Sequence, residues 1–193
     1  GLADSGEGGI PSFQVTNSTQ STISATITVT PSYENNGIIC DGNAETFTIT
    51  VNPSPEMDNV EDVVLCNNEI SSIIEFTTPN TDGNTTYTWT NDNTSIGLSS
   101  TGNGDIPSFT ALNLSPITEV ATITVTPTYE NNGVVCIGDP QTFSISVLSE
   151  IEISGSTVDA LDCNDPNSGN INITVTGGSG VYDFLWSNGA ITE

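Results

Sequence analysis

Acidic side chains and four cysteines are the groups of this chain whose types could do chemistry. Its 193 residues include 24 aspartates and glutamates but no lysine, arginine or histidine, which gives a formal net charge of −24. Without histidine the chain has no ordinary catalytic triad and no imidazole metal ligand. Without lysine it has no Schiff base and no lysine–asparagine isopeptide staple. Carboxylates, thiols and hydroxyls are therefore the groups left to build a site.

Four carboxylates cluster along one Pro-containing stretch, at Glu56, Asp58, Glu61 and Asp62. Paired carboxylates can do acid–base chemistry, but the sequence supplies neither a partner residue nor a pocket for them. Hard oxygen ligands at a junction between modules could hold calcium and stiffen a rod. No EF-hand pattern is present, and a solvated acidic connector is the favoured interpretation. A second and weaker acidic group consists of Asp159, Asp162 and Asp165.

The elements that must position these groups follow from an internal repeat. The segment "ATITVTP" stands at Ala25 and again at Ala121, an offset of 96 residues (121 − 25) that holds without a gap from Gly1/Gly97 to Val51/Val147. About half of the aligned positions are identical. A repeat at constant offset indicates one domain type in tandem. We expect residues 1–53 to be the second half of a repeat whose beginning is missing (the half copy) and residues 54–149 to be a whole repeat (the complete copy). Residues 150–193 (the C-terminal module) differ and are expected to be the start of another module type.

Cysteine pairing is predicted from this repeat. No Cys-x-x-Cys motif exists, so structural disulfides in an oxidising, extracellular setting are favoured over a redox or metal role. Cys40 and Cys136 are equivalent positions, and the complete copy holds only Cys66 and Cys136. The prediction is a Cys66–Cys136 bridge, with Trp89 packed near it. The partners of Cys40 and Cys163 are expected before Gly1 and beyond Glu193.

Composition also excludes partners. A chain without basic residues cannot neutralise phosphates, which excludes nucleic acid and docking on an anionic membrane through a basic patch. No apolar run approaches the ~20 residues of a membrane span. The chain also lacks any trypsin-type cleavage point, which suits exposure to extracellular proteases, and its acidity keeps a surface protein soluble.

Alternation of β-branched and polar residues predicts an all-β fold. "ATITVT" and "TFTITV" read as half-buried strands that form a hairpin, with turn chemistry at Glu34-Asn-Asn-Gly37. About seven short strands in some 96 residues indicate an immunoglobulin-like β-sandwich, repeated along an elongated rod. The strands expected in the complete copy lie near Val60–Cys66, Ser71–Phe76, Thr85–Thr90, Ser95–Leu98, Ser108–Leu114, Val120–Thr126 and Gln141–Val147.

Two family resemblances emerge from these motifs. In the complete copy, "YTWTNDNTSIGL", "GDIPSFTALN", "ATITVTPTYENNG", a cysteine and "PQTFSISV" resemble the PKD-like repeats of very large surface proteins of Bacteroidetes-type bacteria. Cys163 followed by "SGNINITVTGGSGVYDFLWSNGAITE" resembles the SprB repeat of a gliding-motility adhesin, with Val181 and Asp183 where Pro and Thr are commoner. The resemblance implies export by the type IX system, display on the outer surface, and a filament of β modules used in gliding or attachment.

The function favoured here is structural: stalk modules of a secreted cell-surface adhesin, with no enzymatic activity, no cofactor apart from the calcium considered above, and no insertion into the membrane. Other parts of the adhesin would meet an external surface or polysaccharide, and the outer-membrane motility and secretion machinery would be its other partner. The rival is a carbohydrate- or protein-binding module, for which the exposed threonine faces and Trp186 are the candidate surfaces. An enzyme ranks third, because neither a pocket nor a partner residue for the carboxylates is evident.

Overall fold

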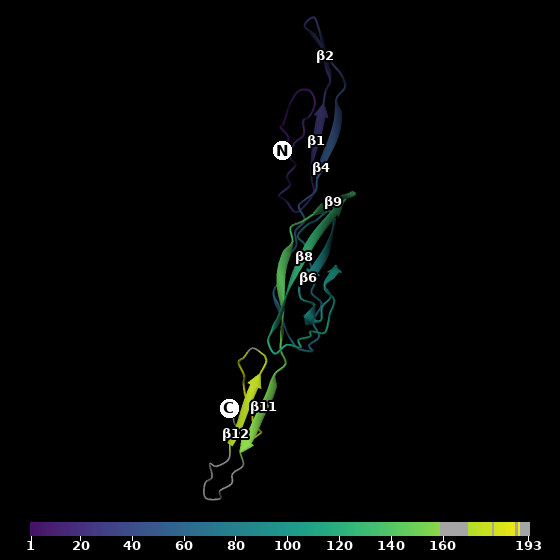
Figure 1. The fold of residues 1–193 in the computed structure, drawn as a ribbon. Coiled ribbons are helices and arrows are strands. Elements are labelled where there is room, and N and C mark those ends of the chain that lie inside the picture. Colours follow the sequence, from purple (N-terminus) through teal and green to yellow (C-terminus); the bar gives the residue numbers. More distant parts are fainter. Residues whose placement is uncertain (159–169, 179, 188, 190–193) are drawn as a thin grey trace. The chain divides into compact units, whose positions relative to one another are not determined.

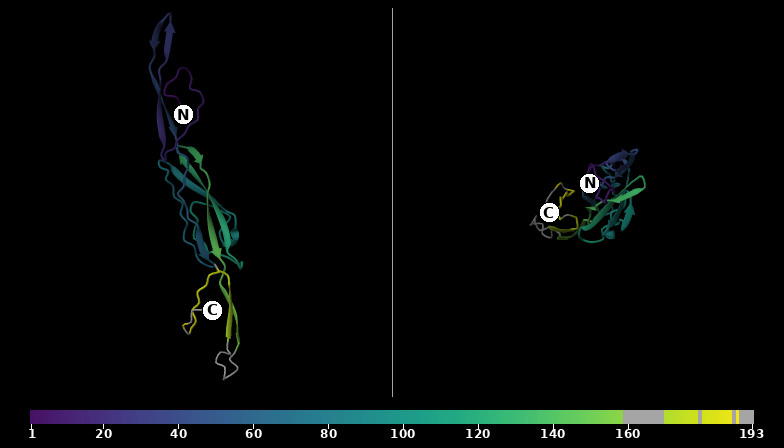
Figure 2. Two further views of the ribbon diagram at one scale, coloured as in Figure 1. Left: turned by 90° about the vertical axis from the view of Figure 1, so that its left-hand side faces the viewer. Right: turned by 90° about the horizontal axis from the view of Figure 1, so that it is seen from above.

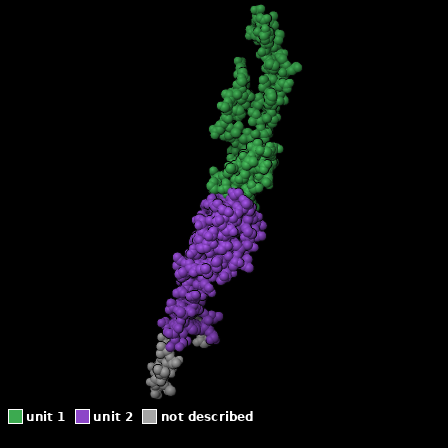
Figure 3. All heavy atoms as spheres, turned by 45° about the vertical axis from the view of Figure 1, so that its right-hand side comes forward, with its two compact units in different colours: residues 1–58, 76–87, 126–140 green, residues 59–75, 88–125, 141–193 purple. Residues whose placement is uncertain are grey.

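The computed structural model describes residues 1–158, 170–178, 180–187 and 189 (Figure 1). The chain forms two compact units (Figure 3). One unit contains residues 1–58, 76–87 and 126–140, and the other contains residues 59–75, 88–125 and 141–193. The complete copy contributes to both units, so the boundaries expected at residues 53 and 149 stay predictions. The secondary structure is almost entirely β, which confirms the predicted fold class.

The half copy forms two antiparallel strand pairs that follow one another along a single hairpin. β1 (Ile23–Val29) pairs with β4 (Glu45–Val51), and β2 (Ser32–Asn35) pairs with β3 (Ile38–Asp41). Asn36 and Gly37 close the hairpin with φ of 51° and 79°, the left-handed pair that a two-residue type I′ turn needs. Figure 1 shows β1 beside β4, with β2 continuing beyond them.

The complete copy is built on a six-stranded sheet. Its path runs β5-β10-β8-β6-β7, with β9 paired to β8, and β5 is parallel to β10. The strands are β5 (Val63–Cys66), β6 (Asn84–Asn91), β7 (Thr101–Asn103), β8 (Glu119–Asn131), β9 (Val134–Ile137) and β10 (Gln141–Leu148). On β8 and β10, alternate side chains are buried, because period-2 strands place every second residue on the core face.

The two copies share one register wherever both are present. Val29 lies opposite Glu45, and 96 residues later Val125 lies opposite Gln141. Each hairpin has the same joint: Gly42 N donates to Pro31 O at 2.7 Å, and Gly138 N donates to Pro127 O at 2.9 Å. Pro127 interrupts neither pairing, because its missing N–H falls between the partners β10 and β9.

An asparagine fixes the same loop in both copies, buried in the complete copy and half-buried in the half copy. The Asn113 amide donates to Ile117 O at 2.8 Å and to Val147 O at 2.7 Å. Asn17 repeats this pattern, with bonds of 2.8 Å to Ser21 O and 3.0 Å to Val51 O. Each donor and acceptor is shifted by 96 residues, so the half copy already holds the local geometry of the complete copy.

The second layer of the complete copy is less regular than the sequence predicted. The expected strands at 71–76 and 108–114 are extended segments joined only by isolated bridges, Ile74 with Ile106 and Ile70 with Thr110. The expected strand at 95–98 is wrong: Thr94–Ile96 is the 3₁₀ turn η1, capped by the Asn93 side chain and ended by Gly97 at φ 88°. Asn93 accepts from Ser95 N, and such local side-chain bonds compete with strand pairing. These segments still cover the sheet, as expected for a sandwich.

The core of the complete copy lies between this layer and the sheet. The Trp89 ring packs closely against Gly102, its register partner on β7, and the cysteine pair predicted beside it is not formed. The buried apolar residues of the complete copy are Met57, Leu65, Phe76, Tyr87, Trp89, Ile96, Leu98, Ile106, Ala111, Ala121, Ile123, Val125, Tyr129, Phe143, Ile145 and Val147.

The C-terminal module contributes one antiparallel pair, β11 (Glu152–Val158) with β12 (Asn170–Thr176), visible side by side in Figure 2. Gly177, at φ 88°, turns the chain so closely past Glu150 that a Cβ would collide with the Glu150 carbonyl. Gly178 N then donates to the Ser149 hydroxyl at 3.0 Å. Among the described residues, no helix has the length and apolar character needed to cross a membrane.

Substituting Gly102 with alanine should destabilise the complete copy, because the new Cβ would lie 2.1 Å from the Trp89 ring. Overpacking of this kind costs about 1–3 kcal/mol. The matched control is Gly6→Ala, which is the equivalent position of the half copy and has no atom within 4 Å of its Cβ. Thermal unfolding of both variants measures the difference. Equal midpoints would contradict the packing of Trp89 on Gly102.

Candidate functional site: the connector between the copies

The segment that joins the two copies is packed rather than free. Along Asn52–Asp58, Pro53, Pro55 and Met57 are buried while the residues between them are exposed. This alternation is that of a strand with one face on a core. Gly138 approaches Pro55 so closely that a Cβ would lie 2.4 Å from the Pro55 carbonyl oxygen. The sequence predicted a Pro-containing connector here, and the structure shows that one side of it is fixed by packing.

Asn80 holds the backbone of the connector. Its side-chain oxygen accepts from Glu56 N at 2.6 Å, and its amide donates to Ser54 O at 3.0 Å. The side chain is 9% exposed. Because it accepts from one connector residue and donates to another, it takes the place of a neighbouring strand's peptide group. Thr78 completes the pairing by donating its hydroxyl to Glu56 O at 2.6 Å.

Tyr129 anchors the loop that carries Asn80. Its ring is fully buried against Gly83, where a Cβ would come within 2.3 Å of the ring. Its hydroxyl donates to Thr81 O at 2.7 Å. The sequence analysis missed both Asn80 and Tyr129. Tyr129 did carry a signal, since a tyrosine recurs at the same place in both copies, as Tyr33 and Tyr129.

Polar contacts then tie the half copy to the complete copy within the same compact unit. Thr81 N donates to Gln20 O at 2.8 Å, and Thr22 N donates to the Asp82 carboxylate at 3.3 Å. The Asn131 amide donates to the Thr22 hydroxyl at 3.0 Å and approaches the Asn52 side chain at 3.4 Å. Asn131 stands at the end of β8, so the strand that forms the core of one copy also binds the other copy.

The four predicted carboxylates do not form one site. The Asp58 carboxylate accepts the Thr77 hydroxyl at 2.6 Å, and Glu61 accepts the Asn59 amide at 2.9 Å. The Asp62 carboxylate accepts Ser144 N at 2.7 Å. Glu56 is bound through its backbone. Each of these residues therefore serves a separate local contact.

No group of three or more acidic or thiol side chains in the described part of the chain is placed to hold a metal ion. The structure thus gives the calcium hypothesis for Glu56, Asp58, Glu61 and Asp62 no assembled ligand set. The weaker candidates Asp159, Asp162 and Asp165, and the cysteine Cys163, lie outside the described residues.

Asp62 has an altered acidity with a clear cause. The backbone N–H of Ser144 and, secondarily, its side chain donate to the carboxylate and lower the pKa of Asp62 below its usual value. A hydrogen bond to the charged form favours that form. The carboxylate is fully exposed, so it is a surface contact between the start of the complete copy and β10, not a catalytic acid.

The predicted Cys66–Cys136 bridge is absent from the structure: Cys40, Cys66 and Cys136 are free thiols. The register gives the reason. Cys66 of β5 is opposite Leu148 of β10, and the preceding residue of β10, Val147, is opposite Glu119 of β8. Cys136 of β9 is opposite Tyr129 of β8. Glu119 and Tyr129 are ten residues apart on β8 (129 − 119), about 33 Å at the usual rise per residue. A disulfide requires Cα atoms within about 7 Å.

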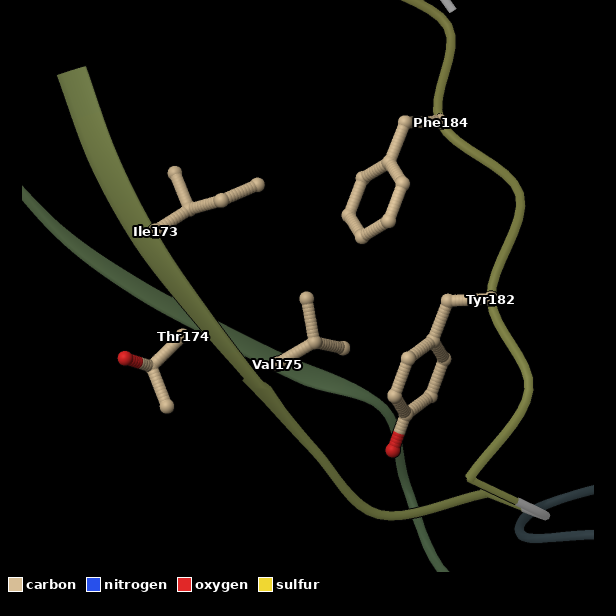
Figure 4. A pocket seen from close by; sticks show the side chains of 5 residues that line it. All are labelled: Ile173, Thr174, Val175, Tyr182 and Phe184. Carbon is tan, nitrogen blue, oxygen red and sulfur yellow. The ribbon is translucent and has the colours of Figure 1, made fainter. Parts of the chain in front are cut away.

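A shallow aromatic groove lies in the C-terminal module. Tyr182 and Phe184 project from one segment toward Ile173 and Val175 of β12, and Thr174 completes the lining (Figure 4). The Tyr182 hydroxyl donates to Gly177 O. Trp186, the predicted aromatic platform, is half-buried, and its carbonyl accepts from Gly189 N at 2.9 Å. The rings of Tyr182 and Phe184 thus face their own sheet.

These features define the class: an all-β protein with an internal repeat, whose candidate site is a packed junction between the copies. In comparison with known proteins, residues 155–191 match the family of the SprB repeat. This match supports the resemblance drawn for the C-terminal module and suggests that these residues are a repeat module of the kind found in cell-surface gliding adhesins. No curated protein and no solved structure matches the chain.

Replacing Asn80 with alanine should loosen the connector. The change removes the side chain that accepts a hydrogen bond from Glu56 N and donates one to Ser54 O. Losing such partners at a buried site lowers the free energy of unfolding by about 1–3 kcal/mol. Amide exchange at Glu56 should accelerate, and the melting temperature should fall. Asn43→Ala, at an exposed loop position, is the matched control. Unchanged exchange at Glu56 would show that Asn80 does not hold the connector.

Acidification should remove the contribution of Asp62. Because its folded pKa is lowered, the stabilisation is present above the unfolded value of about 3.9 and is lost as pH falls through the folded pKa. Asp62→Asn should therefore be less stable than the wild type at pH 7, with the difference shrinking below pH ~4. Urea unfolding at several pH values measures this. A difference that stays constant with pH would contradict the Asp62–Ser144 contact.

Oxidation of the purified chain with glutathione disulfide should not produce a Cys66–Cys136 crosslink, because the register keeps these residues far apart. Non-reducing peptide mapping checks this outcome, and Cys66→Ser should leave the free energy of unfolding within about 0.5 kcal/mol of the wild type. Recovery of the crosslinked peptide pair would restore the original pairing and overturn the register.

Proposed function

We propose that this chain forms stalk modules of a secreted, filamentous cell-surface adhesin used in gliding motility or surface attachment. The observation that carries the proposal is the SprB-repeat match at residues 155–191, directly after tandem copies of an all-β module. On this proposal the tandem copies are PKD-like, immunoglobulin-like sandwiches, and the complete copy spans residues 54–149.

The junction supports a stalk role. A stalk has to transmit force from one module to the next, so successive modules need contacts that limit free rotation. At the junction these contacts are the buried prolines of the connector, the hydrogen bonds of Asn80 to Ser54 and Glu56, and the hydrogen bond of Asn131 to Thr22. Asn131 has an equivalent in Asn35 of the half copy, so the same contact can recur along an array.

The surroundings of the stalk follow from the same proposal. Export through the type IX system would place the chain outside the outer membrane, where a chain without lysine or arginine resists trypsin-like proteases. The motility and secretion machinery would hold one part of the adhesin, and another part would contact the external surface or polysaccharide. A net charge of −24 would keep neighbouring stalks apart.

A cell-level experiment tests the stalk. In the producing cell, one copy of the 96-residue repeat is deleted in frame, and display is followed with antibodies against residues 1–158. The stalk predicts that intact cells remain labelled and attached. Loss of attachment with normal display would favour the alternative, a carbohydrate- or protein-binding module. An adhesin confined to the cell interior would contradict both.

The alternative and the calcium hypothesis have direct tests on the purified chain. A stalk module should bind neither surface polysaccharides nor glycan arrays, and Trp186→Ala should change nothing. Because the carboxylates of Asp58, Glu61 and Asp62 each accept from a separate protein donor, we expect equal melting temperatures in calcium and in EDTA. Specific glycan binding that Trp186→Ala abolishes, or a large drop in melting temperature with EDTA, would require a revised function.

A further inference from the structure

The half copy exposes side chains that the complete copy buries. Phe47 is 59% exposed, whereas its equivalent Phe143 is 6% exposed. Val29 is 44% exposed and its equivalent Val125 is 0%. Ile10, 51% exposed, corresponds to Ile106, which is also fully buried. The same residue types in the same register therefore differ only in what covers them.

The covering in the complete copy comes from its first half. At the edge of the sheet, β5 adds in parallel to β10, with Val63 opposite Ile145. On the other side, β6 follows β8 in the sheet, and Asp92 exchanges bonds with Thr122, whose N donates to the Asp92 carboxylate at 2.7 Å. Leu65 and Trp89 then lie within the core.

The loops are covered from the same source. Ile106 exchanges two backbone bonds with Ile74, each 3.0 Å long, and Ala111 N donates to Glu69 O at 2.8 Å. The equivalents of Ile106 and Ala111 in the half copy are Ile10 and Val15, both 51% exposed. Residues 59–98 thus supply strands, core side chains and loop partners at once.

By contrast, β1 and β4 form a sheet of two strands only. Their outer edges correspond to the edges that take β6 and β5 in the complete copy. Open edges with an apolar face are templates for added strands. An isolated two-stranded pair is also marginally stable in water, so a covered state is strongly favoured.

We propose that the β1–β4 face binds a first half-repeat of the kind that residues 54–96 form, joined ahead of Gly1 in the same polypeptide. One strand adds in parallel along β4 and another lies along β1, while an aromatic residue equivalent to Trp89 packs on Gly6. A second copy of this chain fits less well, because its own residues 54–96 are already bound to β8 and β10.

The decisive experiment extends the chain. A duplicate of residues 54–96 is fused before Gly1, so that the Ile96–Gly97 junction is reproduced as Ile96–Gly1. Hydrogen exchange of the β1 and β4 amides should slow about tenfold or more, toward the rates of β8 and β10. The control extension carries the same 43 residues (96 − 54 + 1) in scrambled order and should leave exchange unchanged.

Gly6→Ala gives a second readout that does not depend on strand exchange. In the chain as it stands the substitution meets no atom within 4 Å. In the extended chain it should lower the melting temperature as Gly102→Ala does, because the duplicated tryptophan would pack on Gly6. Unchanged exchange in β1 and β4, together with a silent Gly6→Ala, would overturn the proposal.

Analytical ultracentrifugation of the original chain distinguishes the other occupant. A monomer whose β1 and β4 amides exchange rapidly is the expected result. Concentration-dependent dimers that protect these amides would assign the face to a second copy and overturn the proposal. None of these outcomes depends on whether the protein serves as a stalk.

Discussion

Burial of one face of the β8–β10 hairpin is the interaction on which the rest of the complete copy depends. Where β8 and β10 pair, six alternating side chains are at most 6% exposed, and the other elements of the complete copy cover or extend them. β5 and β6 add at the two edges, and the irregular segments around Ile106 close the face. Beyond Pro127, β8 continues to Asn131, so one strand connects the core with the junction.

The junction gains its order from the same physics at smaller scale. Alternating prolines fix φ in the connector and remove donors that would otherwise need partners. The remaining connector backbone groups at Ser54 and Glu56 are bonded by Asn80, whose amide imitates a peptide group. A connector satisfied in this way has little freedom left to lose, so it joins two modules without acting as a free linker.

Much of the fold was predictable. Period-2 patterns specified β1, β4, β10 and the first part of β8, because alternating apolar and polar residues mark a strand with one apolar face. The short strands β2, β3 and β9 and the continuation of β8 to Asn131 were not predicted. The irregular second layer was not predictable, since short segments such as Thr94–Ile96 are decided by local side-chain bonds. Among the site residues, the carboxylates were located but not grouped correctly, and Asn80 gave no signal because its partners are more than twenty residues away.

The sequence by itself determined the repeat, its offset, the all-β class and the absence of any basic group, because these are properties of order and composition. Only the tertiary structure decided which cysteines can meet. The repeat suggested Cys66 with Cys136, because the complete copy holds only these two cysteines, yet the parallel pairing of β5 with β10 sets them at distant points of the register. Strand direction and register are collective results of packing, and no single pair of residues in the sequence records them.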